Sequence, residues 1–137
     1  MVAGGVVVDT SVLVAILFGE PEAARLEAAI RAAPVRAVGA PTYVEAAVVL
    51  RAKRGPGGPL ALDALLAALD LTVVPLTAAG ARHARDAYDR FGVGRGRAPA
   101  VLNFGDCLAY GVAAERGAVL LFKGEDFPRT DVRAARY

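Results

Sequence analysis

Four carboxylates interrupt otherwise apolar stretches of this 137-residue chain. Asp9 follows the run Val6–Val8, Glu45 lies within PTYVEAAVVL, Asp106 lies within LNFGDCLAYGVAA, and Asp126 comes shortly after VLLF. A carboxylate that is removed from water costs free energy unless a partner compensates its charge. Four such acids from four separate segments predict one shared site. The compensation that suits a set of oxygen ligands best is a divalent cation.

Two of these acids have only weak alternative explanations. Asp9 could cap the helix that follows it, but Thr10 or Ser11 could do so without a charge. The first cation in the chain is Arg25, so Asp9 has no local ion pair. Glu45 has Pro41, Thr42, Val48 and Val49 as its helical neighbours, so its charge projects from a largely apolar face. The alternative for Glu45 is a buried ion pair with a distant arginine.

The other two acids have stronger alternatives. Asp106 falls in the first turn of a predicted helix, where the helix dipole favours an acid whatever its function. Asp126 has Lys123 and Arg129 three residues away on either side, which is also typical of a solvated turn. Taken alone, each of these two acids is as well explained by its local structure as by a shared site.

Composition limits the class of protein. The chain is 55% hydrophobic and 22% charged with a net charge of +2, which predicts a globular domain and excludes a disordered chain. One cysteine, Cys107, and one histidine, His83, exclude a disulfide framework and make a structural zinc site untenable. We expect Cys107 to be buried and His83 to be exposed. The apolar run at residues 12–18 is too short to span a bilayer, and a cytoplasmic protein is expected.

The hydrophobic pattern alternates strands with helices. Strands are expected at residues 6–8, 35–38, 71–74 and 119–122, and helices at 10–18, 21–33, 41–54, 60–69, 77–90 and 104–115. The segment GPGGP at 55–59 is interpreted as a helix breaker, and the tail at 130–137 as a possible edge strand. This alternation predicts a parallel sheet covered on both faces, in one domain over residues 1–137. Ligands bind at the carboxyl ends of such strands, where Asp9 and Asp126 lie.

Several stretches then resemble a known family. VVVDTSVLVAIL, the glutamate of PTYVEAAVVL, LNFGDCLAYGVAA and LLFKGEDFPRTDV are similar to the PIN-domain ribonucleases, and specifically to the VapC-type toxins of type II toxin–antitoxin pairs. The resemblance implies a three-layer α/β/α fold with a four- to five-stranded parallel sheet. It further implies an endoribonuclease that depends on Mg²⁺ or Mn²⁺, forms a homodimer and is neutralised by a small VapB-type antitoxin.

The acidic positions of the family carry over to Asp9, Glu45, Asp106 and Asp126 as catalytic and metal-binding residues. Asp9 and Asp106 are our first choice for direct ligands. Glu125 stands where relatives often have Asn or Asp, so it could share the role of Asp126. Three polar residues near the acids could orient the ligands or simply cap helices: Thr10, Ser11 and Asn103.

The loop FGVGRGRAP, at residues 91–99, precedes the segment of Asp106 and carries Arg95 and Arg97. These arginines could bind phosphates of RNA, or they could be an exposed basic loop with no role. Two other functions compete with RNA cleavage. A phosphate-transfer domain with an aspartyl nucleophile at Asp9 would need a second acid where Ser11 stands. A catalytically silent RNA-binding module would gain nothing from carboxylates, which repel phosphate.

Overall fold

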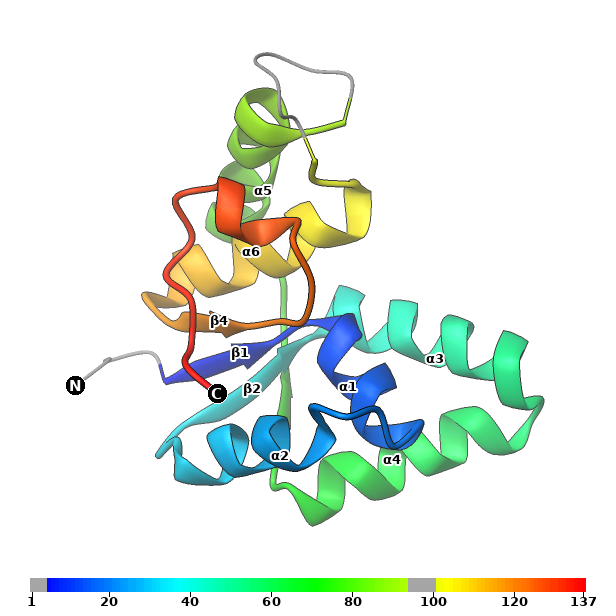
Figure 1. Cartoon of the computed structure of the whole chain (residues 1–137). Coiled ribbons are helices and arrows are strands. Elements are labelled where there is room, and N and C mark those ends of the chain that lie inside the picture. Colours follow the sequence, from blue (N-terminus) through cyan, green and yellow to red (C-terminus); the bar gives the residue numbers. More distant parts are fainter. Residues whose placement is uncertain (1–4, 94–100) are drawn as a thin grey trace.

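The sheet of this protein is parallel throughout. The structure, a computed structural model, describes residues 5–93 and 101–137. Its four strands are β1 (Val6–Val8), β2 (Arg36–Gly39), β3 (Thr72–Val74) and β4 (Val119–Leu121). They lie in the order β3-β2-β1-β4, and Val8 pairs with Leu121 at the end of the β1–β4 ladder (Figure 1). The predicted α/β class with a parallel sheet is therefore confirmed.

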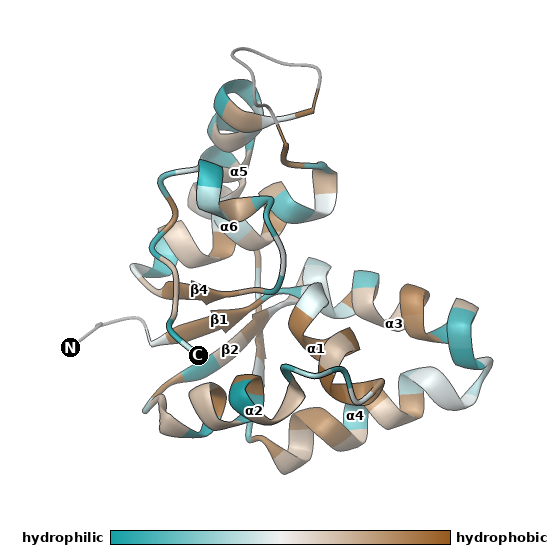
Figure 2. Cartoon of the chain, viewed as in Figure 1, coloured by the Kyte–Doolittle hydropathy of each residue, from teal (hydrophilic) through white to brown (hydrophobic). Residues whose placement is uncertain are grey.

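Helices cover both faces of this sheet. They are α1 (Thr10–Leu17), α2 (Ala23–Ala32), α3 (Ala40–Arg54), α4 (Gly57–Ala68), α5 (Ala78–Phe91), α6 (Phe104–Arg116) and the short η1 (Phe127–Arg129). Side chains of a strand alternate between its two faces, so Val6 and Val8 pack into the core with α1 to α4 while Val7 packs into the core with α5 and α6. Figure 1 shows the resulting three layers, and Figure 2 shows the apolar colouring of β1 and β4 between them.

The segment GPGGP does not separate two helices by a long break. The turn is made by Gly55, whose φ of +71° is in the left-handed region that favours glycine, and α4 already begins at Gly57. Gly58 is buried because α4 approaches α3 closely there: a Cβ at this position would clash with the backbone carbonyl of Leu50. The interpretation of the whole segment as a breaker was wrong, since its second half lets two helices pack together.

The C-terminal tail adds one bridge to the sheet rather than a strand. The backbone N–H of Leu120 donates to Arg133 at 2.8 Å, and that of Ala135 donates to Leu120 at 2.9 Å. Within the described residues this contact is an isolated parallel bridge beside β4, so the predicted edge strand is reduced to a single pairing. Among residues 5–93 and 101–137, no helix is long and apolar enough to cross a membrane.

Candidate metal-binding active site

Asp9 comes directly after β1 and is only 5% exposed. Its Oδ2 accepts hydrogen bonds from the backbone N–H and the hydroxyl of Ser11, at 3.0 and 2.7 Å. Asp9 is therefore itself the N-cap of α1, and the prediction that Thr10 or Ser11 caps this helix was wrong. Burial raises the pKa of Asp9, the bonds from Ser11 and Thr10 oppose this, and the charge of Glu45 adds to it.

Glu45 is held between α1 and α6. From its half-buried position on α3, its Oε1 accepts a 2.6 Å hydrogen bond from the hydroxyl of Thr10. The carboxylate lies against the backbone of Gly105, where any Cβ would collide with it. The glycine of the LNFGDC motif therefore makes room for Glu45 next to Asp106.

Asp106 is the third residue of α6 and forms a capping box with Asn103. Its backbone N–H donates to the Asn103 side chain at 2.8 Å, and its Oδ2 accepts from the Asn103 backbone at 3.1 Å. The pKa of Asp106 is raised to about 7, first by burial and then by the charges of Asp9, Asp126 and Glu45, while the bond from Asn103 opposes this. Asp106 thus caps its helix and also senses the charges of the other three predicted acids.

Asp126 is exposed and is the N-cap residue that precedes η1, just beyond β4. Lys123 instead forms ion pairs with Glu20 and Glu22, and within the described ranges neither Lys123 nor Arg129 pairs with Asp126. Asp126 is thus an exposed residue at a turn, as its alternative explanation predicts, although the two flanking cations do not neutralise it.

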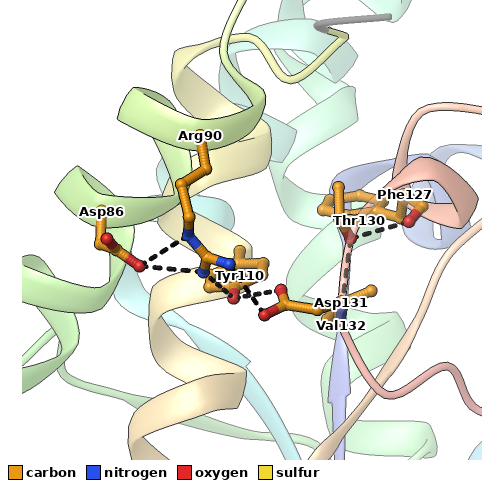
Figure 3. A network of polar contacts seen from close by, with 7 residues as sticks. All are labelled: Asp86, Arg90, Tyr110, Phe127, Thr130, Asp131 and Val132. Carbon is orange, nitrogen blue, oxygen red and sulfur yellow. Dashed lines mark hydrogen bonds and ion pairs between the residues drawn. The ribbon is translucent and has the colours of Figure 1, made fainter. Parts of the chain in front are cut away.

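A polar network fixes the segment that follows Asp126 (Figure 3). The Tyr110 hydroxyl donates to Asp131 at 2.5 Å, and Arg90 donates to Asp131 and to the Tyr110 hydroxyl, each at 3.0 Å. Thr130 closes a turn onto the carbonyl of Phe127, whose buried ring packs 5.0 Å from that of Phe122. The turn after Asp126 is thus tied to α5 and α6.

Sequence reasoning did not predict this network. The partners of Asp131 lie 21 and 41 residues away in the chain. Nothing in the spacing around Asp131 indicates that Tyr110 and Arg90 meet there.

The donor set fits a hard divalent cation, although the acids are not gathered around one point. In the part of the chain that the structure describes, no three His, Cys, Asp or Glu side chains form a group that could hold a metal ion as they stand. The carboxylates of Asp9, Glu45 and Asp106 each accept a hydrogen bond from a nearby residue of the chain instead. The donors are all oxygens, and their mutual repulsion raises the pKa of Asp106, a penalty that a cation removes.

The remaining candidates are inert or outside the described residues. Cys107 is buried, and burial followed by the charge of Asp106 raises its pKa to about 11, so it is no nucleophile. His83 is exposed on α5, as predicted. Arg95 and Arg97 lie outside the described residues.

Comparison with known proteins identifies the class. The PIN domain family matches residues 6–133. Among solved structures, VapC20 of Mycobacterium tuberculosis, described as a sarcin–ricin loop cleaving toxin, superposes with a TM-score of 0.72 at 18% identity, over 96% of this chain and 99% of that one. A toxin–antitoxin complex from Klebsiella pneumoniae superposes with a TM-score of 0.65 at 17% identity, over 92% of each chain. The chain is a PIN-domain protein, and the predicted three-layer fold is confirmed.

Relatives with higher sequence identity define the class of protein more closely. Ribonuclease VapC30 of Mycobacterium tuberculosis is 48% identical over 128 residues, which cover 92% of this chain and 95% of that protein. Ribonuclease VapC of Mycolicibacterium smegmatis is 46% identical over 128 residues, covering 93% and 98%. Within the PIN-domain proteins, the chain therefore belongs to the VapC ribonucleases. These relatives support the ribonuclease interpretation and not a phosphate-transfer domain or a silent RNA-binding module.

Proposed function

We propose that this protein is an endoribonuclease that depends on Mg²⁺ or Mn²⁺ and acts as the toxin of a type II toxin–antitoxin pair. The observation that carries the proposal is the position of Glu45, whose carboxylate accepts a bond from Thr10, next to Asp9, and lies against Gly105, next to Asp106. In agreement, burial and then the charges of Asp9, Asp126 and Glu45 raise the pKa of Asp106 to about 7. Unpaired acids that raise one another's pKa are unfavourable for folding and are typical of functional sites. The names of the relatives supply the substrate class, RNA.

Each acid has a distinct part in this proposal. Asp9 and Asp106 would bind the ion directly, while Glu45 and Asp126 would complete its ligands or orient the attacking water. When bound, a divalent cation offsets the repulsion between carboxylates and phosphate and makes water easier to deprotonate. Cleavage would then be in-line hydrolysis of a phosphodiester, without a covalent intermediate on the protein.

Neighbouring polar residues would keep the acids in place. Ser11 and Thr10 hold Asp9 and Glu45 through hydrogen bonds of 2.7 and 2.6 Å, and Asn103 holds Asp106 through the capping box. The Ser11 hydroxyl also accepts a 3.0 Å bond from the backbone of Lys123, which links Asp9 to the end of β4. Fixing ligands in this way raises metal affinity.

The partners follow from the same proposal. A VapB-type antitoxin would neutralise the protein by placing an arginine among the carboxylates and apolar side chains between helices. Exposed Val44 and Val48 on α3 flank Glu45 and offer an apolar contact for such a segment. The active protein would be a homodimer, and Arg95 and Arg97 would bind phosphates that flank the scissile one.

The decisive experiment is cleavage of single-stranded or loop RNA by the purified, antitoxin-free protein. We expect cleavage with Mg²⁺ or Mn²⁺ and none in excess chelator, because the carboxylates alone repel phosphate. The Asp9→Asn variant, purified in parallel, controls for contaminating nuclease. Full activity of the parent protein in chelator would overturn the proposal.

A further inference from the structure

Phe104 is a large apolar side chain standing in solvent beside the candidate site. It is the first residue of α6, two positions before Asp106, and it is 75% exposed. A single exposed apolar residue needs no explanation, since much of any protein surface is apolar. Phe104, however, does not stand alone, because it forms one wall of a cavity.

This cavity lies between α5 and α6 and has a volume of about 310 Å³. Ala84, Cys107 and Leu108 supply apolar lining, and the rings of Phe104 and Tyr88 are part of its walls. Arg85 and Asp89 also line it, and both are exposed on α5. A cavity at the lower end of the range for small-molecule sites, with apolar lining and aromatic walls, suits a flat, uncharged ring.

The cavity and the candidate site adjoin at the first turn of α6. Cys107 lines the cavity. Asp106, the residue before it, is one of the four acids of the candidate site, and Gly105 contacts the carboxylate of Glu45. The first turn of α6 therefore lies between the cavity and the candidate site, where a phosphodiester would be cut. An RNA strand bound at the acids brings the base of an adjoining nucleotide to this turn.

We propose that the cavity between α5 and α6 receives an unpaired RNA base, with Phe104 as the surface on which that base stacks. This inference rests on the proposed RNA cleavage and adds to it a binding residue. Proteins that recognise single-stranded RNA stack its bases on aromatic side chains, and such stacking tolerates any base because every base has a π face. Phe104 therefore contributes affinity for unpaired RNA rather than the chemical step.

The test compares two probes that have the same charge. One is a single-stranded oligoadenylate, and the other is an abasic ribose-phosphate chain of the same length, both measured with calcium in place of magnesium. Phe104→Ala should bind oligoadenylate about tenfold more weakly and the abasic chain equally well, while Phe104→Tyr keeps the affinity of the parent protein. Leu60→Ala is the matched control, since Leu60 is 71% exposed on α4, away from the cavity.

The outcomes separate this proposal from its alternatives. An equal loss on both probes, or no loss on either, would overturn it, as would a parent protein that does not prefer oligoadenylate to the abasic chain. If Phe104→Ala changes the oligomeric state in sedimentation while RNA affinity stays constant, the surface belongs to a second copy of the chain. Failure of the proposed function looks different, because the parent protein would then cleave no RNA with magnesium or manganese.

Discussion

The protein has two groups of carboxylates in opposite surroundings. We call Asp9, Glu45, Asp106 and Asp126 the acids at the strand ends, and Asp86 and Asp131 the acids around Arg90. In the described residues, Asp9, Glu45, Asp106 and Asp126 have no cation as a partner, and the pKa values of Asp9 and Asp106 are raised. Asp131 shares Arg90 with Asp86. Although burial opposes it, the pKa of Asp131 is lowered because Tyr110 and Arg90 donate hydrogen bonds to it.

This difference separates two uses of a carboxylate. The acids around Arg90 stabilise the folded chain, since their charges are compensated within it. The acids at the strand ends destabilise it, because burial and mutual repulsion are left uncompensated until something binds. Of the two regions, only the one at the candidate site has this uncompensated cost. It lies at the carboxyl ends of the parallel strands, where ligands bind in such sheets.

The largest effect is expected on RNA cleavage by Asp9→Asn and Asp106→Asn. Each should lose more than about a hundredfold in rate, above the usual effect of residues that only orient ligands. Asparagine keeps a carbonyl oxygen for the bonds with Ser11 and Asn103, so local structure is preserved. The control is Asp86→Asn, the same change in an acid paired with Arg90, which should keep the parent rate. Single-turnover rates at saturating RNA measure this, and a nearly unchanged Asp106→Asn would leave Asp106 as a helix cap only.

A smaller effect should distinguish Asp126 from Glu125. The charge of Asp126 raises the pKa of Asp106, whereas that of Glu125 is not among the causes. We therefore expect Asp126→Asn to lower the cleavage rate about tenfold and Glu125→Gln to leave it unchanged. The two residues are adjacent and both exposed, so each variant is the control for the other. Equal losses would mean that Glu125 shares the role of Asp126.

Replacing one acid by asparagine should change the stability of the metal-free protein in opposite directions in the two regions. The folded pKa of Asp106 is about 7 against an ordinary 3.8, so the folded state holds the extra proton between these values and stability falls as pH rises through them. Asp106→Asn removes this loss and should melt at or above the temperature of the parent at about pH 8, with the advantage gone near pH 4.

Asp131→Asn makes the same substitution in one of the acids around Arg90. The folded pKa of Asp131 is lowered, so its contribution is present above an ordinary pKa of 3.8 and disappears only on further acidification. Because solvent screens this exposed pair, the variant should lose only about 1 kcal/mol and melt a few degrees lower at both pH 5 and pH 8. Thermal melts in chelator measure both variants. An Asp106→Asn protein that melts well below the parent at about pH 8 would show that this acid is structural.

The sequence was sufficient where the signal is local. The end of a buried strand is visible in the run of valines before Asp9, and the alternation of strands and helices predicts that Asp9 and Asp126 come to the same edge of the sheet. The position of Asp106 in the first turn of its helix was also visible, because a helix start has a local signature. These features depend on residues close together in the chain.

Features that depend on distant contacts were not visible. Lys123 neutralises Glu20 and Glu22 rather than the nearer Asp126. Gly58 permits close packing on α3, which no breaker rule detects. The exposure of Phe104 was not visible either, since an aromatic residue at a helix start gives no indication of which way its side chain points.

The smallest effect should come from Tyr110→Phe, which removes one hydroxyl from the network in Figure 3. Asp131 loses a 2.5 Å hydrogen bond but keeps Arg90, so the free energy of unfolding should fall by about 0.5–1 kcal/mol. Because the network ties the segment after Asp126 to α6, cleavage should also slow, by roughly two- to threefold.

A double-mutant cycle decides whether this slowing acts through Asp126. If the network positions that acid, Tyr110→Phe should slow the parent protein but have no further effect in an Asp126→Asn background. Tyr43→Phe is the matched control, since it removes a hydroxyl that donates to Asp63 at 2.6 Å between α3 and α4, and it should leave cleavage unchanged. If the slowing by Tyr110→Phe is the same in both backgrounds, the network contributes to stability alone, and the acids around Arg90 are independent of the acids at the strand ends.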